Sequence, residues 1–261
     1  MGMRRRIAAF ALLLTATGAL GAVARAEVVQ SGDVRVNFHA DFSPQALPRE
    51  QAAPISVEVE GKISTSDGTH PPPLQRLRVE LNSAGQVETR GLPHCRSSLL
   101  QSTSSAAALE RCGSAVVGKG SFEAQLPLSS GPIDVGGRAL VFNGVVHGHV
   151  GMLIHIYISS PVRLTLVIPI KVSRREGEFG TVLSTNVPKL AGGFGSITEL
   201  RLRLGRRFSV GGERRSYLSA ACAAPAGFPG AVFPFARGTF GFSGGRTMHS
   251  VLTRNCTVRS G

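Results

Sequence analysis

The stretch Val150–Val172, near the middle of the chain, constrains the fold more than any other part of the sequence. It is the most apolar part of the chain beyond residue 26, and its length alone would allow a membrane span. However, every second residue is apolar from Val162 to Val172, and the same holds from Met152 to Ile158. Period two is typical of strands with one buried face. We therefore expect two neighbouring core strands, separated at Ser159–Pro161.

The alternation also assigns the side chains of this stretch to faces. It predicts that Arg163, Thr165 and Lys171 share the face opposite to that of Leu166 and Ile168.

Similar alternation recurs along the rest of the chain and predicts an all-β fold. Between two cysteines the pattern changes, because Ser104 precedes the run Ala106–Arg111 and Gly113 follows it. Serine is a good N-cap and glycine a good C-terminal residue, so we expect a two-turn helix there. Short strands separated by glycine and proline turns predict a single β-sandwich or jelly-roll-like domain with this one short helix. Beyond the central pair, the main strands are expected at 33–42, 55–63, 77–81, 121–128, 139–142, 179–185, 197–204, 235–242 and 248–258.

The first 26 residues have the pattern of a secretory signal peptide. Three arginines (Arg4–Arg6) precede an apolar run, Ile7–Val23, and Ala24–Ala26 offers small residues at the positions that a signal peptidase reads. The alternative is a membrane anchor, but the run is short for a span. We therefore expect a signal peptide at 1–26, an exported all-β domain at 27–261, and a location outside the cell or in its envelope.

Four cysteines in an exported chain predict two disulfides. Three connectivities are possible, and we favour Cys95–Cys112 with Cys222–Cys256, because each pair brackets a local unit. The chain has no C-x-x-C motif, which argues against a thioredoxin-type site and a zinc ribbon.

The chain is strongly basic, with a formal net charge of +13. Arginine binds anions through a bidentate fork, so the densest arginine cluster is the candidate anion-binding site. We expect it to face anionic cell-envelope polymers or lipid headgroups, and we expect no nucleic-acid partner. The other interpretation is an edge strand protected by charge against aggregation. The cluster comprises Arg201, Arg203, Arg206, Arg207, Arg214 and Arg215.

Two motifs resemble catalytic sites. The run Gly241–Gly245 has the form G-x-S-x-G, and His94, Asp134 and Ser243 follow the triad order of chymotrypsin-like proteases. However, Phe242 stands where those proteases have an aspartate. The simpler interpretation is a hairpin turn with an incidental serine. A secreted serine hydrolase would require the three side chains to converge.

Three histidines could share one strand face. His147 and His149 are two residues apart, and His155 has the same parity, which would suit a metal. No carboxylate or cysteine lies nearby in the sequence, and we expect a glycine-rich turn and one packed histidine instead. The sequence predicts no metal site and no cofactor.

Several stretches resemble those of a group of exported, β-rich proteins from high-GC actinobacteria. That group has no assigned activity, so the resemblance implies export and supplies no catalytic or binding residues. The stretches are PPLQRLRVELN, GLPHC, GSAVVGKGSF, HIY, FGTVL and YLSAACAAPAGFPGAVFPFA.

The functional expectation is a non-catalytic secreted or cell-envelope protein with a structural or binding role. The carboxylates are scattered, and the sequence contains no phosphate-binding loop. One alternative is a carrier that holds an apolar ligand against the inner face of the central strands. An enclosed cavity of roughly 300 Å³ or more would support a carrier. The other alternative is the serine hydrolase described above.

Overall fold

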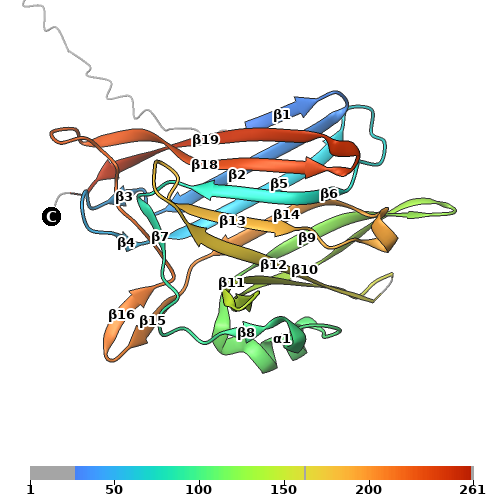
Figure 1. Ribbon diagram of the computed structural model, residues 1–261, viewed down its shortest axis with the longest axis horizontal. Coiled ribbons are helices and arrows are strands. Elements are labelled where there is room, and N and C mark those ends of the chain that lie inside the picture. The colour runs from blue at the N-terminus through green and yellow to red at the C-terminus, as the bar shows by residue number, and fades with distance from the viewer. Residues whose placement is uncertain (1–26, 162, 260–261) are drawn as a thin grey trace, which may run out of the picture.

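The structure is a computed structural model that describes residues 27–161 and 163–259. The predicted signal peptide therefore lies outside the described residues. One sheet of 14 strands dominates the fold, and its members are antiparallel to their neighbours except for two short parallel pairs, β3 with β19 and β8 with β10 (Figure 1). In spatial order the strands are β1 (Glu27–Ser31), β2 (Val34–Ser43), β5 (Ser56–Thr65), β14 (Ser196–Leu204), β9 (Val116–Leu128), β10 (Gly131–Val146), β11 (His149–Ile158), β12 (Leu164–Arg174), β13 (Thr181–Asn186), β6 (Leu74–Leu81), β18 (Gly230–Phe242), β19 (Thr247–Val258) and β3 (Ala46–Leu47), with β8 (Cys95–Arg96) beside β10.

The central apolar stretch forms the hairpin β11–β12, as predicted. Ile154 pairs with Ile168 and Met152 with Ile170 in antiparallel register, and all four side chains are buried. The cis bond before Pro161 lies between the two strands. Val162 lies outside the described residues.

The opposite face of this hairpin is also covered over part of its length. Leu153 and Phe142 pack beneath the segment between Cys95 and Cys112, so β11 is buried on both faces. That segment contains the predicted helix, α1 (Ser105–Cys112), and the Ser104 hydroxyl accepts a hydrogen bond from the Ala107 amide at 3.2 Å. The second apolar face arises because a short helix, too small to fold alone, is packed onto the sheet.

The prediction for the end of this helix was wrong in one detail. Gly113 has a φ of −57°, outside the left-handed region, and it continues into a short 3-10 turn, Gly113–Ala115. The other 3-10 turns are Ser97–Leu99, Ala191–Gly193 and Ser243–Gly245.

The sheet curls until strands far apart in its order meet. Phe38 of β2 lies edge-on to Phe240 of β18, with ring centroids 5.6 Å apart, and Phe42 lies 5.3 Å from Phe235. Figure 1 shows β1 and β19 side by side at this closure. Both layers of the fold therefore come from one continuous sheet, which encloses a shared apolar interior.

Two small sheets complete the fold. The first joins β4 (Ala53–Pro54), β17 (Leu218–Ala220) and β7 (Gly85–Val87), and the second is the hairpin of β15 (Arg207–Val210) and β16 (Glu213–Ser216). No helix in the described part of the chain is long and apolar enough to cross a membrane.

The predicted disulfide pairing is confirmed. Cys95 bonds Cys112 and Cys222 bonds Cys256, each pair with Cα atoms 5.6 Å apart. The first disulfide fixes the helical segment on the sheet, and the second ties the chain after β17 to the last long strand. Both bonds indicate an oxidising, extracytoplasmic environment.

We expect the second disulfide to stabilise the fold slightly more than the first. The bonds close sequence separations of 34 and 17 residues. In the chain-entropy description these separations correspond to about 4 and about 3 kcal/mol. Replacing Cys222 and Cys256 together by alanine should therefore lower the free energy of unfolding by more than the same change at Cys95 and Cys112. Urea denaturation of the two double variants measures both losses of stability. A larger loss for the Cys95 and Cys112 variant would contradict the prediction.

Candidate functional site

The interior of the curled sheet is apolar but incompletely filled. Inward-facing side chains from β5 and β14 on one side, and from β6 and β13 on the other, remain partly exposed although they point toward the core. They line a cavity of about 160 Å³. These side chains are Val57, Val59, Leu77, Val79, Leu81, Leu183, Leu200, Leu202 and Leu204.

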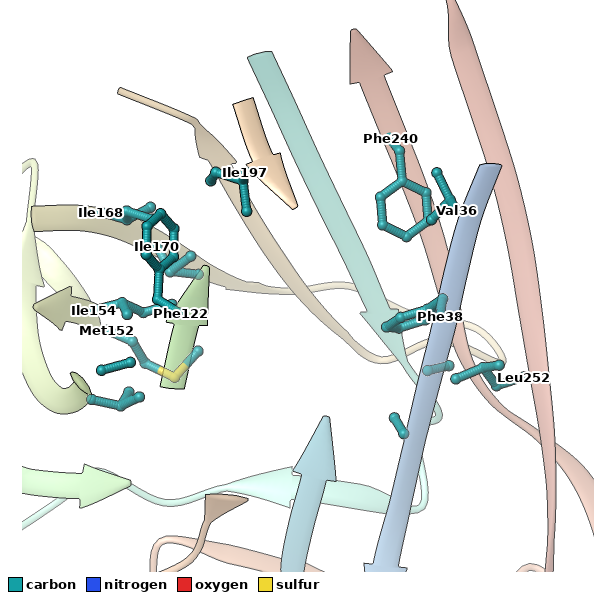
Figure 2. Close-up of a cluster of buried hydrophobic side chains, with 14 of the residues drawn as sticks. Val36, Phe38, Phe122, Met152, Ile154, Ile168, Ile170, Ile197, Phe240 and Leu252 are labelled. Carbon is teal, nitrogen blue, oxygen red and sulfur yellow. The ribbon is translucent and has the colours of Figure 1, made fainter. Parts of the chain in front are cut away.

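Two parts of the core flank the cavity lining. Figure 2 shows one group of side chains around Phe122, Ile154 and Ile168, and a second group around Phe38 and Phe240. Within each group the residues are buried, with at most 5% of any of these five side chains exposed. The unfilled space thus reflects the partly exposed strands β5, β14, β6 and β13, and not loose packing throughout.

The small sheet β4–β17–β7 contributes one wall of the cavity through Leu218, Ala220 and Val87. Tyr217, which directly precedes β17, also lines the cavity and is 1% exposed. Its hydroxyl is buried without a hydrogen-bond partner among the described residues, and burial raises the pKa of Tyr217. A buried, unpaired hydroxyl is unfavourable.

The size of the cavity limits what it can hold. At about 160 Å³ it is roughly half the volume that would support a carrier of drug-sized molecules. It is similar to engineered apolar cavities of about 150 Å³, which stay dry and bind benzene. The cavity therefore suits a ring-sized apolar ligand.

A second hollow lies on the outer face of β6 and β13 and of the adjoining strands β12 and β18. It is a groove of about 440 Å³ whose charged lining residues are Arg76, Arg78 and Lys171, with His147 beside them. Alternation along β6 sends Leu77 inward and its two arginine neighbours outward. The polar lining residues are Ser184, Thr185, Asn186, Thr239 and Thr247.

Next to this groove a buried carboxylate is held by three arginines. Glu80 is 4% exposed, and it pairs with Arg78 at 3.0 Å, with Arg175 at 2.8 Å and with Arg237. The hydrogen bond from Arg237 is the main cause that lowers the pKa of Glu80, and the other two guanidinium groups add to it. Arg237 also stacks over Phe179, 4.6 Å from the ring centroid.

The predicted anion-binding arginines lie on β14, on the β15–β16 hairpin and next to it, and several have partners within the protein. Arg201 pairs with Glu199 at 2.8 Å and with Glu60 at 3.4 Å, and Arg203 pairs with Glu58 at 3.4 Å. Arg206 donates to the carbonyl oxygens of Ser114 and Val116, and Arg215 pairs with Glu213 at 2.8 Å. Arg207 and Arg214 make no ion pair with any residue the structure describes. The anionic partner inferred from these six arginines remains a prediction.

The three candidate metal-binding histidines have separate surroundings. His147 occupies the β10–β11 turn, His149 begins β11, and His155 is fully buried with its Nε2 atom 3.1 Å from the Thr103 carbonyl oxygen. Burial lowers the pKa of His155, which favours the neutral ring. Within residues 27–161 and 163–259, no group of three or more histidine, cysteine or acidic side chains is placed to hold a metal.

The residues of the possible serine triad are not brought together. His94 precedes Cys95, which pairs with Gly144, whereas Asp134 lies ten residues earlier on β10. Ten residues of strand span about 33 Å. Ser243 lies in the predicted hairpin turn between β18 and β19, where Gly244 and Gly245 have positive φ angles.

Comparison with protein-family models, with curated proteins and with solved structures finds no match for this chain. We therefore infer function from the cavity and the groove alone.

We expect the carboxylate of Glu80 to make the fold sensitive to acid. Because the pKa of Glu80 is lowered in the folded protein from its ordinary value of 4.5, its contribution to stability is complete above that value. The contribution is lost as the pH falls below 4.5 and through the folded pKa. Glu80→Gln should lower the free energy of unfolding by about 1–2 kcal/mol at pH 7, since its partners are partly exposed and screened.

Urea denaturation between pH 7 and pH 3 measures both effects. The difference between the parent and Glu80→Gln should shrink as the pH falls. Glu58→Gln is the matched control, because Glu58 is exposed and pairs with Arg203 at 3.4 Å. A constant difference across this pH range would contradict the assignment.

Proposed function

We propose that this chain is a non-catalytic binding protein that works outside the cytoplasm and holds a small apolar ligand inside its curled sheet. The observation that carries the proposal is the unfilled apolar interior of the curled sheet, whose lining includes Tyr217. The two disulfides support the extracytoplasmic location. Secretion or attachment to the cell envelope is part of the proposal, as is relationship to the exported actinobacterial group.

The energetics favour an occupied cavity. Apolar side chains such as Val59, Val79 and Leu202 gain van der Waals contacts when a ligand fills the space between them. The walls come from strands that are already fixed by hydrogen bonds to their neighbours, so little ordering accompanies binding. A preformed apolar cavity of this kind is the usual form of a small-molecule site.

The cavity also indicates the chemistry of the ligand. Its volume corresponds to about six carbon atoms, the size of benzene. The Tyr217 hydroxyl can donate one hydrogen bond and accept another. A ligand with a short apolar body and one hydroxyl or carbonyl group would satisfy both features.

We expect benzene and 1-hexanol to bind the oxidised protein and to raise its melting temperature. Val59→Phe should abolish both effects, because the larger ring would occupy the cavity. Isothermal titration calorimetry and thermal melts measure the loss. Val232→Phe is the matched control, because Val232 is 76% exposed and does not line the cavity.

A second cavity-filling variant, Leu202→Phe, separates filling from misfolding, and circular dichroism reports the fold of each variant. If Val59→Phe and Leu202→Phe fold and bind as the control does, the interior is not the site. If neither ligand changes the melting temperature of the parent, the carrier function is wrong.

We expect Tyr217→Phe to stabilise the ligand-free protein and to weaken the binding of 1-hexanol. Removal of an unpaired buried hydroxyl should raise the free energy of unfolding of the ligand-free protein by about 1 kcal/mol. The same variant should bind 1-hexanol about three- to tenfold more weakly and leave benzene binding unchanged. Urea denaturation and calorimetry with the two ligands measure the effects. A loss of stability would mean that the hydroxyl is paired in the free protein.

A further inference from the structure

The outer groove brings cationic side chains together from separate strands. Arg76 and Arg78 are two residues apart on the outer face of β6, about 7 Å along the strand. Lys171 lies two strands away, because Lys171 pairs with Ser184 and Ser184 pairs with Arg78, which corresponds to about 10 Å across the sheet. Long flexible side chains at these separations can reach one anionic group between them.

The side chain of Arg76 is seated by a glycine on the neighbouring strand. Gly241 pairs with Arg76, and a Cβ atom added to Gly241 would lie 3.3 Å from both the Cβ and the Nε atoms of Arg76. The guanidinium group therefore lies across the backbone of β18, on the floor of the groove. Any larger residue at position 241 would displace it.

The charged lining residues of the groove are all basic. Several arginines elsewhere meet nearby carboxylates, as in the pairs of Arg203 with Glu58 and of Arg246 with Asp33, although Arg207 and Arg214 pair with no described carboxylate. No carboxylate lines the groove, and Arg76 and Lys171 make no ion pair with any residue in the described part of the chain. Arg78 is the exception, since it also contacts Glu80 at 3.0 Å.

The positive field extends beyond the lining residues. Glu80 neutralises one of the three arginines around it, so this cluster retains a net charge of 3 − 1 = +2. Glu178 also interacts electrostatically with Arg237, and with this second carboxylate counted the net charge is 3 − 2 = +1. Cationic side chains in a concave surface attract anions more strongly than the same charges on a flat surface.

The remaining lining residues carry hydroxyl and amide groups. Ser184 lies between Lys171 and Arg78 in the register, and Asn186, Thr239 and Thr247 extend the polar surface. These groups can both donate and accept hydrogen bonds, which suits a ligand that carries hydroxyls of its own. The groove, at about 440 Å³, also offers more room than a lone inorganic anion needs.

One further residue is placed at the groove by an uncommon backbone conformation. His147 has a φ of 50° and Gly148 a φ of 79°, the pattern of a two-residue hairpin turn. Glycine or asparagine would adopt this conformation with less strain. The turn puts an imidazole, which can donate to or accept from a ligand, at the rim of the groove.

We propose that this groove is a binding site for a soluble phosphorylated polyol, in which Arg76, Arg78 and Lys171 hold the phosphate and the hydroxyl and amide side chains bond the polyol. Arginine matches the geometry of phosphate oxygens through its planar fork, and lysine adds a point charge. The site is separate from the interior cavity and does not depend on the proposed carrier function.

Calorimetry with glycerol 3-phosphate, inorganic phosphate and glycerol tests the site in the oxidised protein. Glycerol 3-phosphate should bind more tightly than inorganic phosphate, and glycerol should not bind. Arg76→Gln and Lys171→Gln should each weaken glycerol 3-phosphate binding about tenfold, the loss of one charge-assisted hydrogen-bonding group.

Arg138→Gln is the matched control, because it removes the same charge from an exposed arginine that lies outside the groove and outside the arginine cluster between 201 and 215. Its affinity should stay within about twofold of the parent, and the thermal melts of all three variants should match. Equal weakening by Arg138→Gln would overturn the site, since it would show a general effect of net charge. Equal affinity for phosphate and glycerol 3-phosphate would overturn the polyol assignment. Binding to phosphatidylglycerol vesicles without binding to glycerol 3-phosphate would assign the groove to a membrane surface and overturn the proposal.

Discussion

The contact between the aromatic rings of β2 and β18 is the interaction on which the rest of the structure depends. Eight strands separate β2 from β18 in the order of the sheet, yet Phe38 meets Phe240 and Phe42 meets Phe235 across the interior. An open sheet of this width would leave one whole apolar face in water. The rings are large enough to bridge the space between the two layers, so they convert one sheet into an enclosing wall. The same closure allows an ion pair between Arg246 and Asp33, 2.8 Å apart.

The same closure explains why part of the interior stays open. Where β2 faces β18, phenylalanine rings meet across the interior, whereas the apolar side chains that β5, β14, β6 and β13 contribute to the cavity lining are valine and leucine. Aliphatic side chains are shorter than aromatic rings. At the same separation between the two layers, valine and leucine side chains therefore leave a gap. The small sheet β4–β17–β7 covers this region and brings Tyr217 to it. The distribution of ring-bearing residues along the strands thus separates a packed part of the core from a hollow part.

The sequence predicted the elements whose signal is local. Alternation located the hairpin β11–β12, the Ser104 cap located the helix, and the spacing of the cysteines suggested the correct pairing. The strand expected at 121–128 is longer in the structure, because β9 begins at Val116 and continues through Gly120. In the structure a Cβ atom at position 120 would lie 1.8 Å from the Arg201 carbonyl oxygen, so this glycine permits close approach of β14.

The candidate sites depend on contacts that no local pattern contains. Arg76 and Lys171 are 95 positions apart, and only the order β12–β13–β6 brings them to one groove. The alternation of Arg76, Leu77 and Arg78 was visible, but it did not say that the outward face would be concave. The density of arginines between 201 and 215 was a stronger local signal. Several of those arginines meet carboxylates or carbonyl oxygens from other strands, which only the fold reveals.

Strand β6 forms a wall of both the cavity and the groove, because its successive side chains point to opposite faces of the sheet. Leu77 and Val79 face the apolar interior, while Arg76 and Arg78 face the outer groove. Either surface can change one residue at a time without altering the other. An insertion or deletion of one residue within β6 would exchange the two sets, placing guanidinium groups in the core and leucine in the groove. The two surfaces can therefore change independently by substitution. Both depend on the same register of β6, which sets the face to which each side chain points.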